Sequence, residues 1–316
     1  MCLIGLAIEQ HPRFALVIAS NRDEFFARPT ARLGWWRPAP AEPDVPDVLS
    51  GRDLQSGGTW LGLTTHGRLA MLTNVRGGLT HEADAPSRGR VVTDWLAARE
   101  STAEFWTRTA LSGHNGFNLI AADFRRGECF RASNADRQAL RVGPGLYGLS
   151  NAGFDAPWPK VVALKQRMRE ALDSSLTIDA LAAQLFAALG DRSVATDAAL
   201  PSTGIALNRE RQLSAAFIGM ADAGYGTRCS TIIVTERTAR QPVTHVFERS
   251  FDAAGAVALL RSTMLRNWPP RDGEGDLVEA VEGAPPPGAD RRPAASAAPG
   301  RRSRVRSRRG PATIKP

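Results

Sequence analysis

Cysteine is scarce in this sequence, and its scarcity excludes two kinds of architecture. The 316 residues contain three cysteines, at positions 2, 129 and 229, and their spacing matches no ligand or disulfide motif. We therefore expect neither a disulfide framework nor a structural zinc site, and no cofactor. Such cysteine usage suits a reducing compartment, so the cytoplasm is the expected location.

Long hydrophobic runs are also missing, which bears on membrane association. No apolar run approaches the roughly 20 residues that a membrane-spanning helix needs. The first residues lack the basic segment and the long apolar segment of a signal peptide. Apolar residues still make up 43% of the composition, as in ordinary globular proteins. We expect a globular protein with neither a transmembrane segment nor a signal peptide.

Acidic residues disappear from the last part of the sequence. Beyond Asp290 there are nine Lys or Arg residues and no Asp or Glu, set among Pro, Ala, Ser and Gly. Because this composition cannot bury a core, we predict a single domain over residues 1–268 and a disordered basic tail over residues 269–316. The tail carries half of the net charge of +8. Basic tails attract nucleic acid nonspecifically, but this excess lies outside the domain, so we expect no specific nucleic-acid partner.

The apolar residues occur in short runs that are typical of strands and in longer, helically spaced ones. Two runs at residues 3–8 and 14–19 flank a short polar turn and predict a β-hairpin. Similar patterns predict strands at residues 59–64, 68–73, 118–123, 128–132, 145–150, 229–235 and 244–251, and helices at residues 87–99, 157–172, 178–189 and 254–265. The Pro-rich segment 35–48 predicts a long surface loop, and residues 50–53 and 56–58 predict turns. This order favours an α+β fold with antiparallel sheets and helices outside them.

Cys2 stands at the start of the first predicted strand. Removal of Met1 would leave it as the amino-terminal residue, with an α-amine of pKa about 7.7–8.0 beside a thiol of pKa about 8.5. An amine of this pKa accepts the thiol proton near neutral pH, as in an N-terminal nucleophile. The alternative is a buried structural cysteine. Because hairpin strands are antiparallel, Asn21, Arg22 and Asp23 return beside Cys2.

Three further polar residues lie at the ends of predicted strands. Asn74 and Asn151 each follow a strand, and Arg228 opens another. Asn is common in turns and caps, and Arg228 is equally consistent with a surface charge. Taken together with Cys2 and the residues beside it, the pattern predicts a catalytic cleft.

Six motifs carry a family resemblance that extends over residues 1–268. They are Met1-Cys2, Asn21-Arg22-Asp23-Glu24, Gly57-Gly58-Thr59-Trp60-Leu61-Gly62, Leu72-Thr73-Asn74, Leu149-Ser150-Asn151 and Gly226-Thr227-Arg228. Together they resemble the NRDE family, which is the family of the transport and Golgi organisation protein 2. They also resemble the choloylglycine hydrolase and penicillin V acylase group of N-terminal nucleophile hydrolases.

The resemblance implies a fold and a set of roles. The fold would be an αββα sandwich, inside which the sulfur of Cys2 attacks an amide carbonyl. Asp23 would hold the α-ammonium, and Arg22 or Arg228 would lower the thiol pKa. Asn74 and Asn151 would donate hydrogen bonds to the developing oxyanion.

Two functions follow as alternatives. One is hydrolysis of an amide bond in a small or lipid-like substrate. The other is a non-catalytic carrier or trafficking role for haem or an acyl lipid, since the family is tied to haem trafficking, lipid homeostasis and Golgi organisation. In both cases we expect the partner to be a small or lipid-like molecule.

Overall fold

The computed structural model describes residues 2–38, 45–77, 82–136 and 138–270. These residues belong to one compact unit, which the contacts delimit at residues 1–272. The predicted tail lies outside the described residues from residue 271 onward. Within the described residues, no helix is both long enough and apolar enough to cross a membrane.

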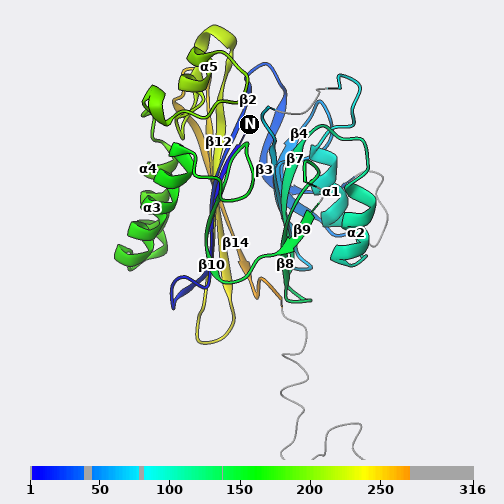
Figure 1. Cartoon of the computed structure of the whole chain (residues 1–316). Coiled ribbons are helices and arrows are strands. Elements are labelled where there is room, and N and C mark those ends of the chain that lie inside the picture. The colour runs from blue at the N-terminus through cyan, green and yellow to red at the C-terminus, as the bar shows by residue number, and fades with distance from the viewer. Residues whose placement is uncertain (1, 39–44, 78–81, 137, 271–316) are drawn as a thin grey trace, which may run out of the picture. The chain divides into compact units, whose positions relative to one another are not determined.

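Two antiparallel sheets form the centre of the unit (Figure 1). The first sheet has the order β10 (Gly145–Leu149), β1 (Cys2–Ile8), β2 (Phe14–Phe25), β12 (Tyr225–Glu236), β13 (Val243–Phe251) and β14 (Val257–Arg266), and β11 (Gly219–Met220) also pairs with β12. The second sheet has the order β3 (Thr30–Trp36), β4 (Val48–Asp53), β5 (Leu61–Thr64), β6 (Arg68–Asn74), β7 (Phe117–Asp123), β8 (Glu128–Ser133) and β9 (Gln138–Arg141).

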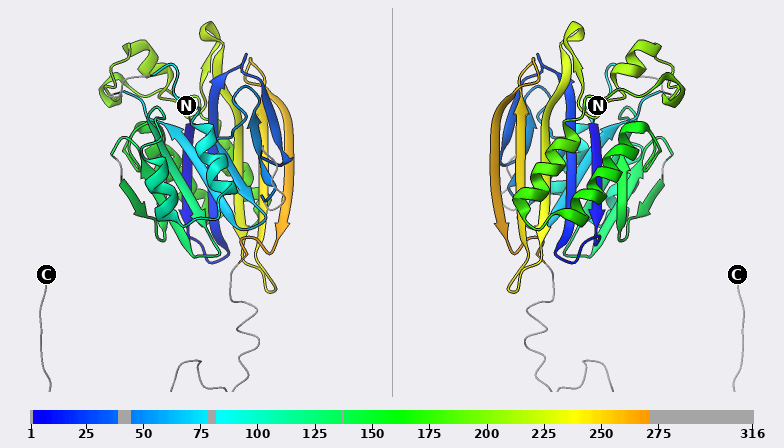
Figure 2. Two further views of the ribbon diagram at one scale, coloured as in Figure 1. Left: turned by 90° about the vertical axis from the view of Figure 1, so that its right-hand side faces the viewer. Right: turned by 90° about the vertical axis from the view of Figure 1, so that its left-hand side faces the viewer.

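Helices cover the two outer faces (Figure 2). The first sheet is covered by α3 (Pro159–Ser174) and α4 (Ile178–Leu189), and the second by α1 (Gly89–Ala97) and α2 (Thr102–Thr109). The remaining short helices are α5 (Leu207–Gln212), η1 (Asp197–Ala199) and η2 (Ala221–Ala223). The four layers form an αββα sandwich, which confirms the predicted fold.

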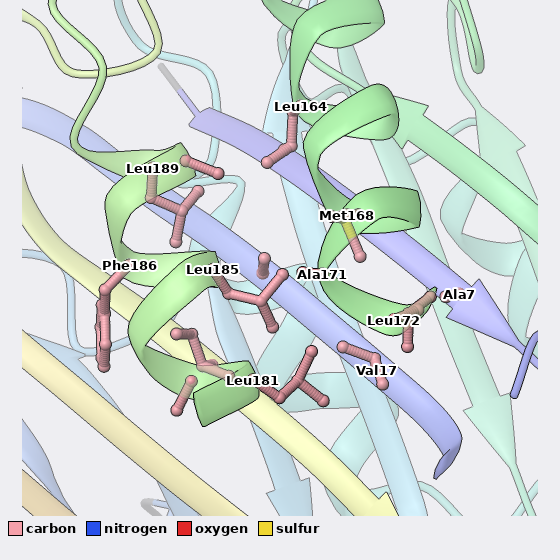
Figure 3. Close-up of a cluster of buried hydrophobic side chains, with 14 of the residues drawn as sticks. Ala7, Val17, Leu164, Met168, Ala171, Leu172, Leu181, Leu185, Phe186 and Leu189 are labelled. Carbon is pink, nitrogen blue, oxygen red and sulfur yellow. The ribbon is translucent and has the colours of Figure 1, made fainter. Parts of the chain in front are cut away.

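Side chains of β1 alternate between two hydrophobic cores, one between the first sheet and its helices and one between the two sheets. Leu3 and Ala7 pack against α3 and α4, whereas Ile4 and Leu6 face the second sheet. Figure 3 shows the helix-side layer, where Leu164 and other apolar side chains of α3 and α4 lie over the first sheet. Complete burial of one such side chain contributes about 1.5–3 kcal/mol.

Gly5 allows α3 to lie close against β1. A Cβ atom added at Gly5 would collide with Sδ of Met168 and would lie 3.1 Å from Cδ2 of Leu164. The missing side chain therefore sets the distance between the helix and the strand. This contact also brings the first turn of α3 to the amino-terminal end of β1.

The structure corrects two predictions about secondary structure. Residues 254–265 do not form a closing helix, because β14 occupies this region and pairs with β13. Its side chains are mostly exposed, so backbone pairing with β13, rather than a buried helical stripe, determines the conformation. Residues 50–53 belong to β4 rather than to a turn, and β4 pairs with β3 and β5. The predicted loop at residues 35–48 begins after β3 ends at Trp36, and residues 39–44 lie outside the described residues.

Candidate active site

Cys2 is the first residue of β1 and lies at an edge that is shared by the ends of strands from both sheets. In the register of β1 and β2, Cys2 lies opposite Arg22. A cavity of about 130 Å³ lies here, and it is lined by residues of both sheets, including Cys2, Arg22, Asp23 and Asn74. Four of the six residues to which the family resemblance gives catalytic roles therefore line one cavity. The side chain of Cys2 is 8% exposed.

The thiol of Cys2 is held in its protonated form by its surroundings. Burial raises the pKa of Cys2, and the nearby charge of Asp23 raises it further. The charge of the amino terminus, the charge of Arg22 and a hydrogen bond from the backbone of Asp23 lower the pKa of Cys2, but together they do not outweigh burial. A buried neutral thiol is a weak nucleophile. Attack by this sulfur therefore needs a base next to it.

Arg22 is fixed beside the thiol by three contacts. Its guanidinium lies over the ring of Trp60, 4.2 Å from the centroid. Nη1 donates a hydrogen bond to Oγ1 of Thr30 at 2.9 Å. Nη2 lies 3.8 Å from Oδ2 of Asp53, and Arg28 binds the same oxygen at 2.7 Å. The stacked and ion-paired guanidinium therefore provides a fixed positive charge at the cavity.

Asp23 follows Arg22 in β2, so its side chain points to the opposite face of the sheet. It is 1% exposed, and its Oδ1 accepts a hydrogen bond from Oγ1 of Thr227 at 2.7 Å. The hydroxyl of Tyr225 donates to the backbone oxygen of Asp23 at 3.0 Å. Burial raises the pKa of the Asp23 carboxyl, whereas the charge of Lys160 lowers it. Asp23 thus presents a buried carboxylate beside the amino-terminal end of β1.

The two asparagines occupy different positions. Asn74 ends β6 and lines the cavity, and among the described residues its side-chain amide has no hydrogen-bond partner. Asn151 is completely buried, and its Nδ2 donates to the backbone oxygen of Asn74 at 2.8 Å. The hydroxyl of Ser150 donates to the backbone oxygen of Cys2 at 3.1 Å. Asn151 and Ser150 therefore connect the end of β10 to Asn74 and to Cys2.

Arg228 lies apart from the cavity. It occupies a bulge in β12, where the pairing with β2 shifts between Thr227 and Cys229. Its Nη1 donates to the backbone oxygens of Phe25 and Arg28, at 2.7 and 3.0 Å. It does not line the cavity at Cys2. In this position Arg228 holds the connection between β2 and β3.

Two residues near Cys2 were not singled out in the sequence. Arg88 lines the cavity, and its Nη1 donates to the backbone oxygen of Gly116 at 3.3 Å. Lys160 is 4% exposed in the first turn of α3, and burial lowers its pKa to about 8 although the charge of Asp23 opposes this. A sequence signal for Lys160 did exist, because it precedes Leu164 and Met168 on the buried stripe of the helix.

The described residues contain no group of three or more His, Cys, Asp or Glu side chains placed to hold a metal ion. The groups gathered around Cys2 are a thiol, a carboxylate, an amide and cations. Such a set suits nucleophilic chemistry at a carbonyl.

The protein is thus an αββα sandwich. Its Cys2 lines a cavity that lies where strands of both sheets end. The chain belongs to the Transport and Golgi organisation 2 family, whose model matches residues 1–253. This match confirms the family resemblance of the sequence motifs.

Several known proteins are similar to this chain. The Transport and Golgi organization protein 2 homolog of Bos taurus is 35% identical over 252 residues, covering 75% of this chain and 89% of the relative. The Homo sapiens homolog is 33% identical over 254 residues with the same coverage. Among solved structures, the Caenorhabditis elegans ortholog of N-acylethanolamine-hydrolyzing acid amidase has a TM-score of 0.43 and 10% identity, covering 74% of this chain and 92% of that chain. A single-residue variant of conjugated bile acid hydrolase from Clostridium perfringens has a TM-score of 0.43 and 10% identity, covering 84% of this chain and 97% of that chain.

Proposed function

We propose that this protein is an N-terminal nucleophile hydrolase that cleaves an amide bond of a small or lipid-like substrate, with Cys2 as the nucleophile. One observation carries the proposal. Cys2 from one sheet and Asn74 from the other line the same cavity, so a nucleophile and a free amide donor face one space. The buried carboxylate of Asp23 lies at the same strand end.

In the proposed reaction, the α-amine of mature Cys2 takes the thiol proton while the sulfur attacks the amide carbonyl. The carbonyl oxygen becomes an oxyanion and accepts a hydrogen bond from the side-chain amide of Asn74. The α-ammonium then gives its proton to the leaving nitrogen, and the C–N bond breaks to leave a thioester on Cys2. Water, activated by the same amine, hydrolyses the thioester, which releases the acid and restores the thiol.

The other residues have supporting roles in this proposal. The fixed charge of Arg22 stabilises the thiolate as it forms. Asp23 orients the α-ammonium, and Asn151 holds the backbone of Asn74. Arg228 maintains the loop after β2 and does not touch the substrate. A reducing, cytoplasmic setting would keep the Cys2 thiol reduced.

The size of the cavity limits what it encloses. Its volume of about 130 Å³ is below the roughly 300–1,000 Å³ typical of sites that engulf a drug-sized ligand. We infer that the cavity holds the reacting amide and that the rest of the substrate lies outside it. The carrier function for haem or an acyl lipid is the alternative, and such a ligand would need more enclosed space than this cavity offers.

An electrophilic β-lactone distinguishes the two functions. We expect intact-mass spectrometry to show one covalent adduct per chain, and we expect Cys2→Ala to abolish it. The matched control is Cys129→Ala, which should retain the adduct because burial raises the pKa of Cys129 to about 12. Equal labelling of the wild type and Cys2→Ala, or transfer of the label to Cys129, would refute the hydrolase and favour the carrier.

A further inference from the structure

One arginine at the candidate active site is not paired with a carboxylate of the described residues. Arg88 immediately precedes α1, is partly buried and lines the cavity at Cys2. Its Nη1 donates to the backbone oxygen of Gly116 at 3.3 Å, and that oxygen already accepts the N–H of Val75 at 2.9 Å. Across the part of the chain that the structure describes, Arg88 forms no ion pair. Because a guanidinium has five N–H donors, most of them remain available to a ligand.

The other two arginines of the cavity are paired with its carboxylates. Arg22 lies 3.8 Å and Arg28 lies 2.7 Å from Oδ2 of Asp53. Arg28 also lies 3.9 Å from Oε2 of Glu24. Arg88 is within electrostatic range of Glu24 but forms no ion pair with either carboxylate.

The third carboxylate at this strand end is not available to Arg88 either. Asp23 points to the opposite face of β2, where it accepts a hydrogen bond from Thr227 at 2.7 Å, and it has further interactions of its own. Arg88 therefore lines the cavity as a cation whose counter-ion is not supplied by the described residues around it.

The fold itself does not account for a positive charge at this position. Arg88 stands before the first turn of α1, and no described side chain forms a capping hydrogen bond there. The amino-terminal end of a helix carries a partial positive charge, which disfavours a neighbouring cation. Partial burial of an unpaired cation costs further free energy. These costs are offset if an anionic ligand binds in the cavity.

The cavity has three walls, and Arg88 lies on the wall that carries no reacting group. Cys2 comes from the first sheet, Asn74 from the second, and Arg88 from the segment that leads into α1. The cavity encloses about 130 Å³, so little more than the reacting amide fits between these walls. A group only a few bonds from an amide held by Cys2 and Asn74 therefore reaches Arg88.

We propose that Arg88 is a specificity-determining residue that binds a carboxylate located a few bonds from the scissile amide of the substrate. A planar carboxylate matches the guanidinium fork and accepts two parallel hydrogen bonds from it. The small cavity favours this compact, flat anion over a bulkier tetrahedral phosphate. This inference rests on the proposed hydrolase function, and it narrows the substrate class to amides with a carboxylate close to the bond that is cleaved.

The first test uses pairs of β-lactones that differ in one group. Each pair contains a carboxymethyl lactone and its neutral carboxamide analogue, with the substituent on the α-carbon in one pair and on the β-carbon in the other. The α-carbon places the charge on the acyl side of the bond that breaks, and the β-carbon places it on the leaving-group side. Acylation of Cys2 in the full-length mature protein would be followed by intact mass in the wild type, Arg88→Gln, Arg88→Lys and Arg90→Gln.

The wild type should prefer the carboxylate in at least one pair. In Arg88→Gln, the ratio of the two acylation rates should fall by about 10-fold or more, because a charged hydrogen-bonded contact is lost. Arg88→Lys keeps the charge without the planar fork and should restore part of the preference. Arg90→Gln is the matched control, because Arg90 is exposed and does not line this cavity, and its ratio should equal that of the wild type. Equal slowing of both members of each pair in Arg88→Gln, or an unchanged ratio, would overturn the inference.

A second measurement detects the carboxylate site without requiring catalysis. Sodium acetate should raise the midpoint of urea unfolding of the wild type and Arg90→Gln, relative to sodium chloride at the same ionic strength, but not that of Arg88→Gln. Equal stabilisation of all three proteins, or of none, would overturn the inference. If no β-lactone acylates Cys2 while stabilisation by acetate still depends on Arg88, the hydrolase proposal fails and the carboxylate site stands. If the lactones acylate Cys2 with ratios that do not depend on Arg88, the hydrolase stands and this inference fails.

Discussion

Replacement of Asn74 by Ala tests the proposed oxyanion donor. The substitution removes a side-chain amide that lines the cavity, while the backbone oxygen of Asn74 still accepts its hydrogen bond from Asn151. Loss of one oxyanion donor typically lowers the rate by about 10²–10³, or 2.7–4 kcal/mol of transition-state stabilisation. Because Asn74 is only partly buried and the amide has no partner, stability should change by less than about 0.5 kcal/mol.

The buried Asn151 supplies the matched comparison. In Asn151→Ala, the backbone oxygen of Asn74 loses its donor inside the protein. An unsatisfied buried group costs about 1–3 kcal/mol, so the unfolding free energy should fall by this amount. The rate should fall less than in Asn74→Ala, because the donating amide is still present although less firmly held.

The assay measures β-lactone acylation of Cys2 together with urea unfolding for both variants. The reasoning is refuted if Asn74→Ala is acylated at the rate of the wild type. It is also refuted if Asn151→Ala loses more rate than Asn74→Ala and keeps its full stability, since Asn151 would then be the donor.

Three other predictions follow from particular contacts. Arg228→Ala should lower the unfolding free energy by about 1 kcal/mol through its lost backbone contacts, yet keep acylation within about twofold of the wild type, as urea unfolding and mass spectrometry would show. Because the pKa of Lys160 is lowered from 10.5 to about 8, the unfolded chain holds a proton that the folded chain has lost between these values, so Lys160 should contribute a rise of about 3 kcal/mol to the unfolding free energy over this pH range. Burial raises the pKa values of the cysteine thiols, which oppose this rise equally in both proteins, so urea unfolding should show it as a difference between the wild type and Lys160→Met that changes with pH. Gly5→Ala should lower the unfolding free energy by about 1–3 kcal/mol, because its Cβ would collide with Met168, and an unchanged midpoint of thermal unfolding would contradict the close packing of α3 on β1.

The sequence was most informative where local pattern and tertiary burial agree. The hairpin of β1 and β2 was predicted from two apolar runs around a polar turn, and its register returns Arg22 to Cys2 as expected. The helices α3 and α4 were found from their apolar spacing because each buries one face against the first sheet. Such predictions hold because the spacing of apolar residues in the sequence matches the spacing of the residues that the strand or helix buries.

The errors fell where pairing with a distant segment decides the structure. β14 was predicted as a helix because its apolar residues have no clear alternation, and its strand conformation depends on the free edge of β13. Residues 50–53 are predicted as a turn from their Ser, Gly and Asp side chains, although they continue β4 and pair with β3. No helix is predicted where α2 lies, although the capping box of Ser101 and Glu104 at its start is a local helix signal.

For the site as well, the sequence predicts what depends on neighbouring residues and misses what depends on contacts between distant segments. Strand ends in the sequence pointed to Cys2, Asp23 and Asn74, and these line one cavity. The sequence could not distinguish the partly buried amide of Asn74, which lines the cavity, from the fully buried amide of Asn151, because that difference depends on how β10 meets β6. Nor could it show that a bulge in β12 turns Arg228 toward backbone oxygens instead of the cavity.

The central claim is that Cys2, as the amino-terminal residue, is the nucleophile. Its most direct test is peptide mass spectrometry of the full-length protein after reaction with the β-lactone. We predict that the first peptide begins at Cys2 without Met1 and carries one acyl group on the sulfur of Cys2. A reactive protein that retains Met1, or an amino-terminal peptide that stays unmodified while Cys129 is acylated, would contradict the account.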